Sequence, residues 1–226
     1  KWIDLQKSLL SNKKYDYEPI RLHRQTIRRI FNDKDFTQGG RFYGGWWQNI
    51  PSRYRSLITI DGSRIAEFDF GKLHPTIMYA DAKAKCEGDA YDIGLDPKHR
   101  DTIKELFNAM VQMDKFTDNP PKVKFSQTGK RWKELRDMIL ERHKPIRHMF
   151  FCGIGNSLQY RDSKIAEQVM LYFAKRDIPV LPVHDSFLIQ TGLYIELLEV
   201  MEKEFKKQIG VTINIKPVQK LTRVRA

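Results

Sequence analysis

Long apolar runs are missing from this sequence. Its 226 residues contain no stretch of about 18 consecutive apolar residues, the length that a membrane-spanning helix needs. The opening segment KWIDLQKSLL also lacks the apolar region of a secretory signal peptide. We therefore expect no membrane partner and a cytoplasmic location, with association to a nucleoid, a phage or a mobile element left open.

Cysteine and the common cofactor motifs are also scarce. Cys86 and Cys152 fit no zinc-binding or redox spacing, so we expect free thiols in a reducing compartment. The six histidines show no metal-ligand spacing. The sequence has neither a GxxxxGK[ST] phosphate loop nor a GxGxxG dinucleotide motif, and the HxE…PCxxC motif of zinc deaminases is missing. These absences argue against the corresponding nucleotide chemistries.

Positive charge is present in excess. The chain has 40 Lys and Arg against 28 Asp and Glu, a formal net charge of +12. A field of this sign attracts polyanions, nucleic acid first, although a soluble basic protein without such a partner would show the same sum. Trp46 and Trp47 follow a glycine-rich loop, where they could stack on bases or cover the core.

The hydrophobic pattern predicts an α+β fold, an antiparallel sheet with helices on one face. The runs LITI and RIAEFDF, joined by Asp61-Gly62, predict a hairpin over residues 56–70. Residues 178–190 predict a second strand-turn-strand around His184-Asp185-Ser186, and residues 211–218 a closing strand. Helices are expected over residues 1–32, 71–84, from 98, over 131–143, from 145, from 159, and over 194–209.

Two aspartates stand at corresponding places in the two expected hairpins. Asp69 lies at the end of a strand and Asp185 beside a turn. One such aspartate usually satisfies turn N–H groups. Two of them in a strongly basic chain favour a metal site, because neighbouring carboxylates repel each other and a divalent cation removes that conflict. Oxygen ligands favour Mg²⁺, with Mn²⁺ as an alternative, and a two-ion site of this kind performs phosphoryl transfer.

A basic helix face accompanies this pair. Arg100 and Lys104 are four residues apart and share one side of the expected helix, and Asn108 extends that side by another turn. Two cations one turn apart can grip a triphosphate, whereas a solvated basic face would show the same pattern.

In their order along the chain, these segments resemble the palm and fingers of family-A DNA polymerases, the DNA polymerase I type, and more distantly the phage-type single-subunit RNA polymerases. The resemblance covers roughly residues 39–218. The matching segments are Gly40-Arg41 with Gln48-Asn49-Ile50-Pro51 and Arg53, Asp69 as motif A, Arg100-x3-Lys104 as the start of motif B, Gln159 to Met170, and Val183-His184-Asp185 as motif C. Motif C continues as Ser186-Phe187, in the manner of the RNA polymerases.

The resemblance implies a role for each matching residue. Asp69 and Asp185 would bind two Mg²⁺ ions, with the Phe70 carbonyl as an additional ligand. Arg100 and Lys104 would hold the incoming triphosphate, with Lys104 protonating the leaving pyrophosphate and Asn108 beside them. The residues implied at the primer-template are Arg41, Gln48, Asn49, Arg53, Gln159 and His184. Of these, Gln48, Asn49 and Arg53 would contact its backbone or support their own loop.

The sequence departs from the family pattern at several positions. His74 stands five residues after Asp69, where the family pattern implies a residue that helps to exclude a ribose 2′-hydroxyl. A bulky ring there favours deoxynucleotides, but a histidine can also form a hydrogen bond with a hydroxyl. Asn108 occupies the place of the motif B aromatic residue, and Ser186 that of the motif C acidic residue.

The resemblance implies a division into an N-terminal helical thumb remnant (1–38), palm with motif A (39–82), fingers (83–150) and palm with motif C (151–226), with most of the thumb absent. The implied activity is template-directed nucleotidyl transfer without proofreading, most simply a DNA polymerase that extends a primer with dNTPs. A protein partner or further chain would supply the thumb function. The alternatives are an RNA polymerase or primase on the same palm, and an inactive nucleic-acid-binding module.

Overall fold

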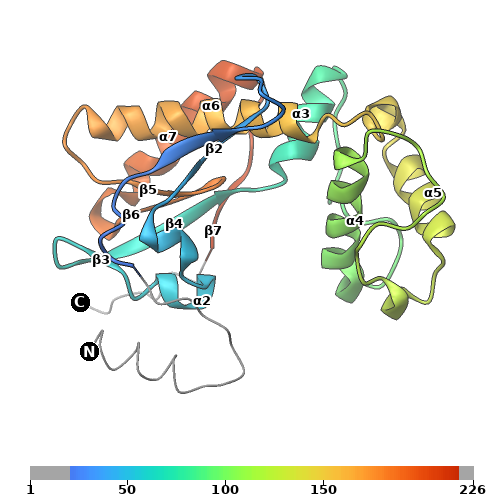
Figure 1. The fold of residues 1–226 in the computed structure, drawn as a ribbon, viewed down its shortest axis with the longest axis horizontal. Helices are drawn as coiled ribbons and strands as arrows, with labels where there is room; N and C mark the ends of the chain where they lie inside the picture. Colours follow the sequence, from blue (N-terminus) through green and yellow to red (C-terminus); the bar gives the residue numbers. More distant parts are fainter. Residues whose placement is uncertain (1–20, 219–226) are drawn as a thin grey trace.

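An antiparallel sheet flanked by helices forms one side of the molecule (Figure 1), seen in a computed structural model that describes residues 21–218. The strand order is β3-β4-β6-β5, and β7 pairs with β4 as well. The strands are β3 (Thr59–Ile60), β4 (Ser63–Phe70), β5 (Leu181–Val183), β6 (Ser186–Gln190) and β7 (Ile215–Pro217). The part of the first expected helix that falls in residues 1–20 lies outside the described residues.

Both predicted hairpins are confirmed. Asp61 and Gly62 connect β3 to β4 with φ values of 48° and 74°, the two positive angles that a type I′ turn requires. His184 and Asp185 connect β5 to β6, where Val183 pairs with Ser186. The closing strand is confirmed as β7, which pairs antiparallel with the end of β4.

Strand alternation decides which side chains of β4 enter the core. Ala66, Phe68 and Phe70 are each 3% exposed and belong to the main core, together with residues of α6 (Gly155–Ala174) and α7 (Tyr194–Ile209). Burial of each phenylalanine contributes about 1.5–3 kcal/mol. Because successive side chains point to opposite faces, Glu67 and Asp69 lie on the face of the sheet away from these helices.

That second face carries a smaller cover of short elements. The 3₁₀ helix η1 (Trp46–Asn49) and the short helix α2 (Ser52–Arg55) bring Trp47, Ile50 and Ile58 against Leu188 of β6. The Trp47 indole N–H donates to the carbonyl of Pro182 at 2.9 Å. For Trp47, the structure therefore selects the core interpretation over base stacking.

Within the described residues, the helix predicted up to residue 32 is wrong, because residues 21–27 contain no helix and Arg28–Phe31 forms strand β1. This strand pairs antiparallel with β2 (Gly39–Tyr43), so part of the expected glycine-rich loop is also a strand. Long-range contacts outweigh the local pattern here, because Arg29 donates to the Gly40 carbonyl at 2.9 Å and to the Ser163 hydroxyl of α6 at 2.8 Å. A Cβ on Gly40 would lie 2.9 Å from the Arg29 and Phe31 side chains, which explains the glycine.

Residues 83–150 form a helical lobe beside the sheet (Figure 1). It contains α4 (Arg100–Gln112) and α5 (Trp132–Arg142), and α3 (Leu73–Asp81) leads into it from β4. The helix expected from Pro145 is instead the 3₁₀ helix η4 (Lys144–Met149). The remaining short elements are the 3₁₀ helices η2 (Pro97–His99), η3 (Ser126–Thr128) and η5 (Thr191–Leu193).

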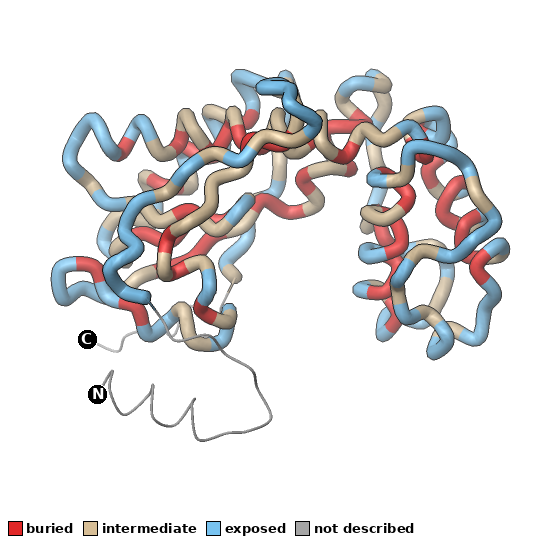
Figure 2. Tube along the Cα trace, in the orientation of Figure 1, coloured by how far each residue is buried: buried red, intermediate tan, exposed pale blue. Residues whose placement is uncertain are grey.

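One continuous core joins the lobe to the sheet. Phe107 of α4 and Ile139 of α5 are fully buried and belong to the same cluster as Phe70 of β4. Figure 2 shows the buried parts of α4 and α5 on the sides that face each other. Among the described helices, none has the length and apolarity to span a bilayer.

Candidate active site

The register of the sheet determines the surroundings of Asp69. On one side Asp69 pairs with Ser186 of β6, and on the other with Lys216 of β7. Paired residues point to the same face, so these three side chains form a row. The Lys216 ammonium lies 4.0 Å from Asp69 Oδ2. Asp69 thus stands at the end of the long central strand, with a basic residue directly beside it.

Asp185 occupies the neighbouring turn. Its carbonyl accepts a bond from the Phe70 N–H at 3.4 Å, which ties this turn to the residue after Asp69. His184, the first turn residue, has a φ of 58°. A side chain in this left-handed region costs free energy, and such residues gather at functional sites. The His184 ring also packs edge-on against Tyr43 of β2, with centroids 5.3 Å apart.

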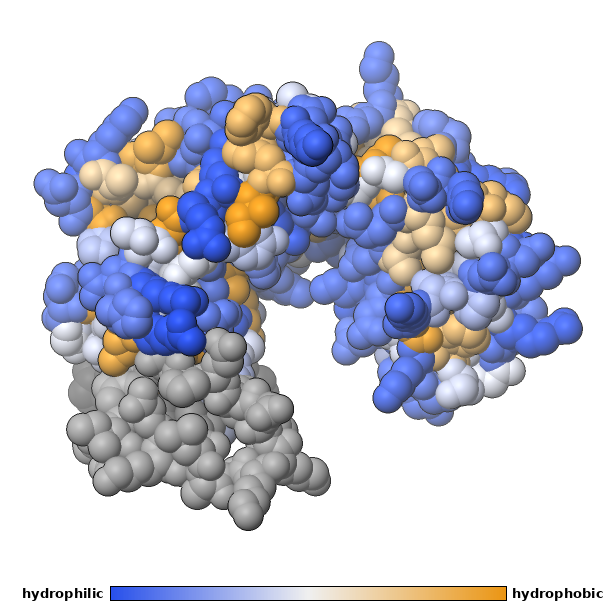
Figure 3. All heavy atoms as spheres, in the orientation of Figure 1, coloured by the Kyte–Doolittle hydropathy of each residue, from blue (hydrophilic) through white to orange (hydrophobic). Residues whose placement is uncertain are grey.

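A cavity of about 270 Å³ opens between the sheet and α4. The predicted site residues that line it are Arg41, Asp69, Phe70, His74, Arg100, Lys104, Asn108, Gln159, His184 and Asp185. They come from β2, β4, α3, α4, α6 and the β5–β6 turn. Figure 3 shows a hollow with mostly hydrophilic sides between the sheet side and the helical lobe. The structure therefore brings together residues up to 144 positions apart, Arg41 and Asp185.

The surroundings of Asp69 in the cavity disfavour its charged form. Burial and the neighbouring Asp185 charge raise the pKa of Asp69 to about 7, while Lys216 and Lys104 act in the opposite direction. Two partly desolvated carboxylates that repel each other are the donor set that a divalent cation stabilises. Across residues 21–218, no group of three or more His, Cys, Asp or Glu is positioned to hold a metal. An ion there would take two protein carboxylates and complete its shell with other oxygens, as Mg²⁺ does.

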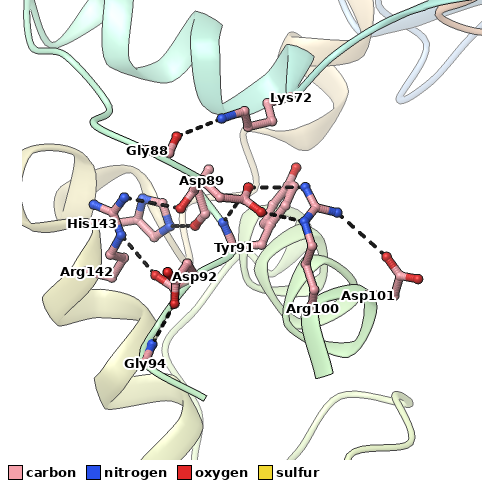
Figure 4. Close-up of polar contacts among 11 residues, drawn as sticks. Lys72, Gly88, Asp89, Tyr91, Asp92, Gly94, Arg100, Asp101, Arg142 and His143 are labelled. Atoms are coloured by element: carbon pink, nitrogen blue, oxygen red, sulfur yellow. Dashed lines mark hydrogen bonds and ion pairs between the residues drawn. The ribbon is translucent and has the colours of Figure 1, made fainter. Parts of the chain in front are cut away.

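Arg100 begins α4 and is held on two sides (Figure 4). Its Nε and Nη2 donate to the two carboxylate oxygens of Asp89 at 2.5 and 3.1 Å, and its guanidinium lies 5.0 Å from the centroid of the Tyr91 ring. The Asp89 hydrogen bond raises the pKa of Arg100 further above its usual value. This bidentate contact orients the guanidinium, while Nη1 lies 3.7 Å from Oδ1 of the exposed Asp101, a looser ion pair that a phosphate can replace.

The segment that presents Asp89 is itself fixed at several points. Arg142 of α5 donates to the carbonyls of Glu87, Asp89 and Asp92, the last at 3.0 Å. From the sheet side, the Lys72 ammonium donates to the Gly88 carbonyl at 2.8 Å (Figure 4). This segment therefore links the helical lobe to the beginning of α3 and sets the position of Arg100 relative to Asp69.

Arg41 and His74 meet at a carboxylate that the sequence analysis did not single out. Asp162 of α6 is 4% exposed, and its Oδ2 lies 2.5 Å from Arg41 Nη2 and 3.2 Å from His74 Nε2. The sequence could have pointed to Asp162, because it follows Gln159 by three residues and therefore lies on the same side of the expected helix.

Other cavity residues were also missed. Lys72, Tyr91, Gln112 and Lys216 line the cavity beside the predicted residues. Gln112 continues the helix face of Asn108 by one turn, and strand alternation pairs Lys216 with Asp69, so both could have been found. Nothing local in the sequence marks Tyr91.

Gln48, Asn49 and Arg53 do not line the cavity. The Gln48 amide instead holds its own loop, donating to the carbonyls of Phe42 at 2.9 Å and Pro182 at 3.0 Å, and accepting from Gly44 N at 3.0 Å. Asn49 and Arg53 are exposed. Of the two roles expected for Gln48, contact with nucleic acid or support of the loop, these contacts favour support.

Comparison with solved structures finds a similar fold. The structure superposes on the POL domain of Pol1 from M. smegmatis, solved in complex with DNA primer-template and dNTP, with a TM-score of 0.51 and 12% sequence identity. The match covers 85% of this chain and 46% of that chain, so this chain spans about half the length of that domain. No protein-family model and no curated protein matches the sequence. The fold is therefore polymerase-like.

Proposed function

We propose that this chain catalyses template-directed nucleotidyl transfer, as a DNA polymerase that extends a primer 3′-hydroxyl with dNTPs. The observation that carries the proposal is one cavity that places Asp69 and Asp185 opposite Arg100 and Lys104. Paired carboxylates facing paired cations match the two needs of phosphoryl transfer, a metal site and charge neutralisation of the phosphates. The polymerase-like fold supports this choice among the phosphoryl-transfer reactions.

The helical lobe would bind the incoming nucleotide. Arg100 and Lys104 lie one turn apart on α4 and line the cavity, so both can contact one triphosphate. Asp89 and Tyr91 hold the Arg100 guanidinium in place before the nucleotide arrives, which lowers the ordering cost of binding. Lys104 would give a proton to the leaving pyrophosphate.

Asp69 and Asp185 would hold Mg²⁺, or Mn²⁺, with the Phe70 carbonyl as a further oxygen ligand. The bound ions would supply activation of the primer hydroxyl and neutralisation of charge on the leaving group. Burial and repulsion from Asp185 raise the pKa of Asp69, and cations that share the two carboxylates would relieve the repulsion. Lys216 would partly neutralise Asp69 in the absence of metal.

The primer terminus would lie on the sheet side of the cavity. Arg41 and Gln159 line this side, beside His184 on its strained turn. Asn49 and Arg53 would contact the primer-template farther from the cavity, on the short elements that cover the second face of the sheet. A thumb function would come from a protein partner or from further chain.

A labelled primer-template extension assay tests the proposal. We expect primer lengthening with dNTPs and Mg²⁺, dependent on a template. Each nucleotide type is tried with Mg²⁺ and with Mn²⁺, and EDTA provides the metal-free control. Binding of the primer-template without extension under every condition would contradict the proposal and favour an inactive nucleic-acid-binding module.

One observation favours a second candidate, an RNA polymerase or primase. His74 Nε2 lies 3.2 Å from Asp162 Oδ2, so a neutral His74 ring that donates through Nε2 has Nδ1 as an acceptor. An acceptor in the cavity could bind a ribose 2′-hydroxyl. Incorporation of NTPs in preference to dNTPs in the same assay would select this candidate.

A further inference from the structure

We propose that Asp162 is the positioning residue through which His74 discriminates against a 2′-hydroxyl on the incoming nucleotide. The inference rests on the proposed function and names the specificity device of that site. Asp162 itself is nearly buried, whereas the ring that it contacts lines the cavity. The proposed selectivity therefore depends on a side chain that the nucleotide does not touch.

The first step of the argument is the identity of the bonded atoms. Asp162 accepts from Arg41 Nε at 3.0 Å and from Nη2 at 2.5 Å, a paired contact between a carboxylate and a guanidinium. Arg41 Nη2 lies 3.5 Å from His74 Nε2, farther than Asp162 Oδ2 at 3.2 Å. A carboxylate oxygen accepts, so Nε2 donates to Asp162 in the shorter contact. This hydrogen bond fixes both the tautomer and the orientation of the ring.

The second step is the rigidity of the arrangement. The three residues come from three elements, Arg41 from β2, His74 from the first turn of α3 and Asp162 from the middle of α6. The Asp162 side chain is 2% exposed, and those of Arg41 and His74 are 19% and 15% exposed. Solvent therefore competes weakly for these bonds, and a ring that turned aside would give up its hydrogen bond with a buried carboxylate.

The third step is the place of the ring in the cavity. His74 lines the same cavity as Asp69, Arg100 and Lys104, so it lies beside the space proposed for the nucleotide. The RNA polymerase candidate and this inference differ in whether the fixed ring binds the 2′-hydroxyl through Nδ1 or excludes it sterically. Steric exclusion needs a fixed ring, since a ring free to change rotamer would admit the hydroxyl. The sugar preference should consequently depend on the Asp162–His74 bond as well as on the size of the ring.

The test compares Asp162→Asn with a matched Asp81→Asn control. Asparagine keeps the size of Asp162, but it lacks the charge that pairs with Arg41. Its amide faces His74 with either an N–H group or a weaker acceptor than a carboxylate. Asp81 forms another Asp–Arg pair between α3 and α6, with Arg161 Nη2 donating to Asp81 Oδ1 at 3.0 Å, and it does not line the cavity. Thermal unfolding checks that both variants are folded.

The measured quantity is the ratio of kcat/KM for dATP to that for ATP in single-nucleotide extension. We expect the wild type to prefer dATP, the Asp162→Asn ratio to fall by about tenfold, as for the loss of one buried hydrogen bond, and the Asp81→Asn ratio to stay unchanged. In a His74→Ala background, Asp162→Asn should leave the ratio unchanged, because the residue through which Asp162 acts is gone.

Three results would overturn the inference. The first is an Asp162→Asn variant that slows dATP and ATP use equally, since that is a structural effect alone. The second is a fall in the ratio that persists in the His74→Ala background, since Asp162 would then act through Arg41. The third is a wild type without a preference for dATP. If the wild type extends no primer, the proposed function fails. The inference is then tested by the ratio of the equilibrium dissociation constants for dATP and ATP, and the same three results would overturn it.

Discussion

The Tyr79 hydroxyl lies 3.1 Å from His143 Nδ1 in the core of the helical lobe. On the other side of the ring, His143 Nε2 lies 2.8 Å from the carbonyl of Ala90, which can only accept. Nε2 therefore carries the proton, and Nδ1 accepts from Tyr79. A neutral ring satisfies both contacts, and burial lowers the pKa of His143 to about 4.

This neutral histidine predicts a pH dependence of stability. The folded pKa lies below the unfolded value of 6.5, so the unfolded chain binds more protons between these values. Stability should be fully present above pH 6.5 and fall as the pH drops towards 4, by about 3 kcal/mol at most. Urea unfolding between pH 4.5 and 7.5 measures the slope. His143→Gln should flatten it and the exposed-site control His148→Gln should not, whereas equal slopes in all three proteins would contradict this account.

Trp47 is predicted to stabilise the fold rather than bind bases. Its ring is 5% exposed, and its N–H is bonded to Pro182. Trp47→Ala should lower the free energy of unfolding by about 3–5 kcal/mol, because it leaves a cavity and removes one of the two hydrogen bonds to the Pro182 carbonyl. Chemical denaturation measures this loss, and Trp47→Phe should retain primer-template affinity. A folded Trp47→Phe protein with no affinity for nucleic acid would restore the base-stacking interpretation.

A buried ion pair between Arg55 and Glu67 makes a second stability prediction. Arg55 donates to both Glu67 oxygens, at 2.6 and 2.9 Å, and Ser186 donates to the same carboxylate at 2.9 Å. Arg55→Met should cost about 3–5 kcal/mol, because Glu67 remains buried without its cation.

The control for this pair is Arg64→Met, since Arg64 is an exposed arginine on β4, the strand that also carries Glu67. Urea unfolding should show little change in that variant. The double variant Arg55→Met with Glu67→Gln should recover part of the loss. Equal stability of Arg55→Met and the wild type would show that the pair contributes nothing.

Arg100 and Lys104 are predicted to act on nucleotide binding. Arg100→Ala and Lys104→Ala should each raise the KM for dNTP by about 10- to 150-fold, the loss of one charge-assisted contact. Lys104→Ala should also lower kcat, because it removes the proposed proton donor. Lys98→Ala is the matched control, a basic residue at the same end of α4 that is 68% exposed and does not line the cavity. Steady-state extension kinetics give these constants, and an unchanged KM in both variants would remove α4 from the proposed nucleotide site.

The parts of the fold that were predictable from the sequence rest on local signals. Asp61-Gly62 between two β-rich runs marked the first hairpin, and period-two alternation marked the closing strand β7. Helical spacing of apolar residues marked α4, and with it the shared face of Arg100 and Lys104. These features depend on residues within about one turn of each other, which is the range where pattern and propensity decide structure.

The features that escaped prediction depend on distant partners. Arg28–Phe31 reads as a basic helix in isolation, yet it becomes a strand because Arg29 reaches Ser163, 134 positions away. In the sequence, Asp162 is one acidic residue on an expected helix, and only the folded structure shows that it contacts His74. Nothing local distinguishes Asp89 as the partner of Arg100 either. Such pairings arise from the assembled fold.

The most direct measurement is template-dependent primer extension by Asp69→Ala and Asp185→Ala, with primer-template affinity measured in parallel. Asp81→Ala serves as control, since Asp81 is exposed and away from the cavity. The account predicts that each cavity variant loses extension while it binds the duplex almost as well as the wild type, and that the control extends normally. Normal extension by either Asp69→Ala or Asp185→Ala would contradict it.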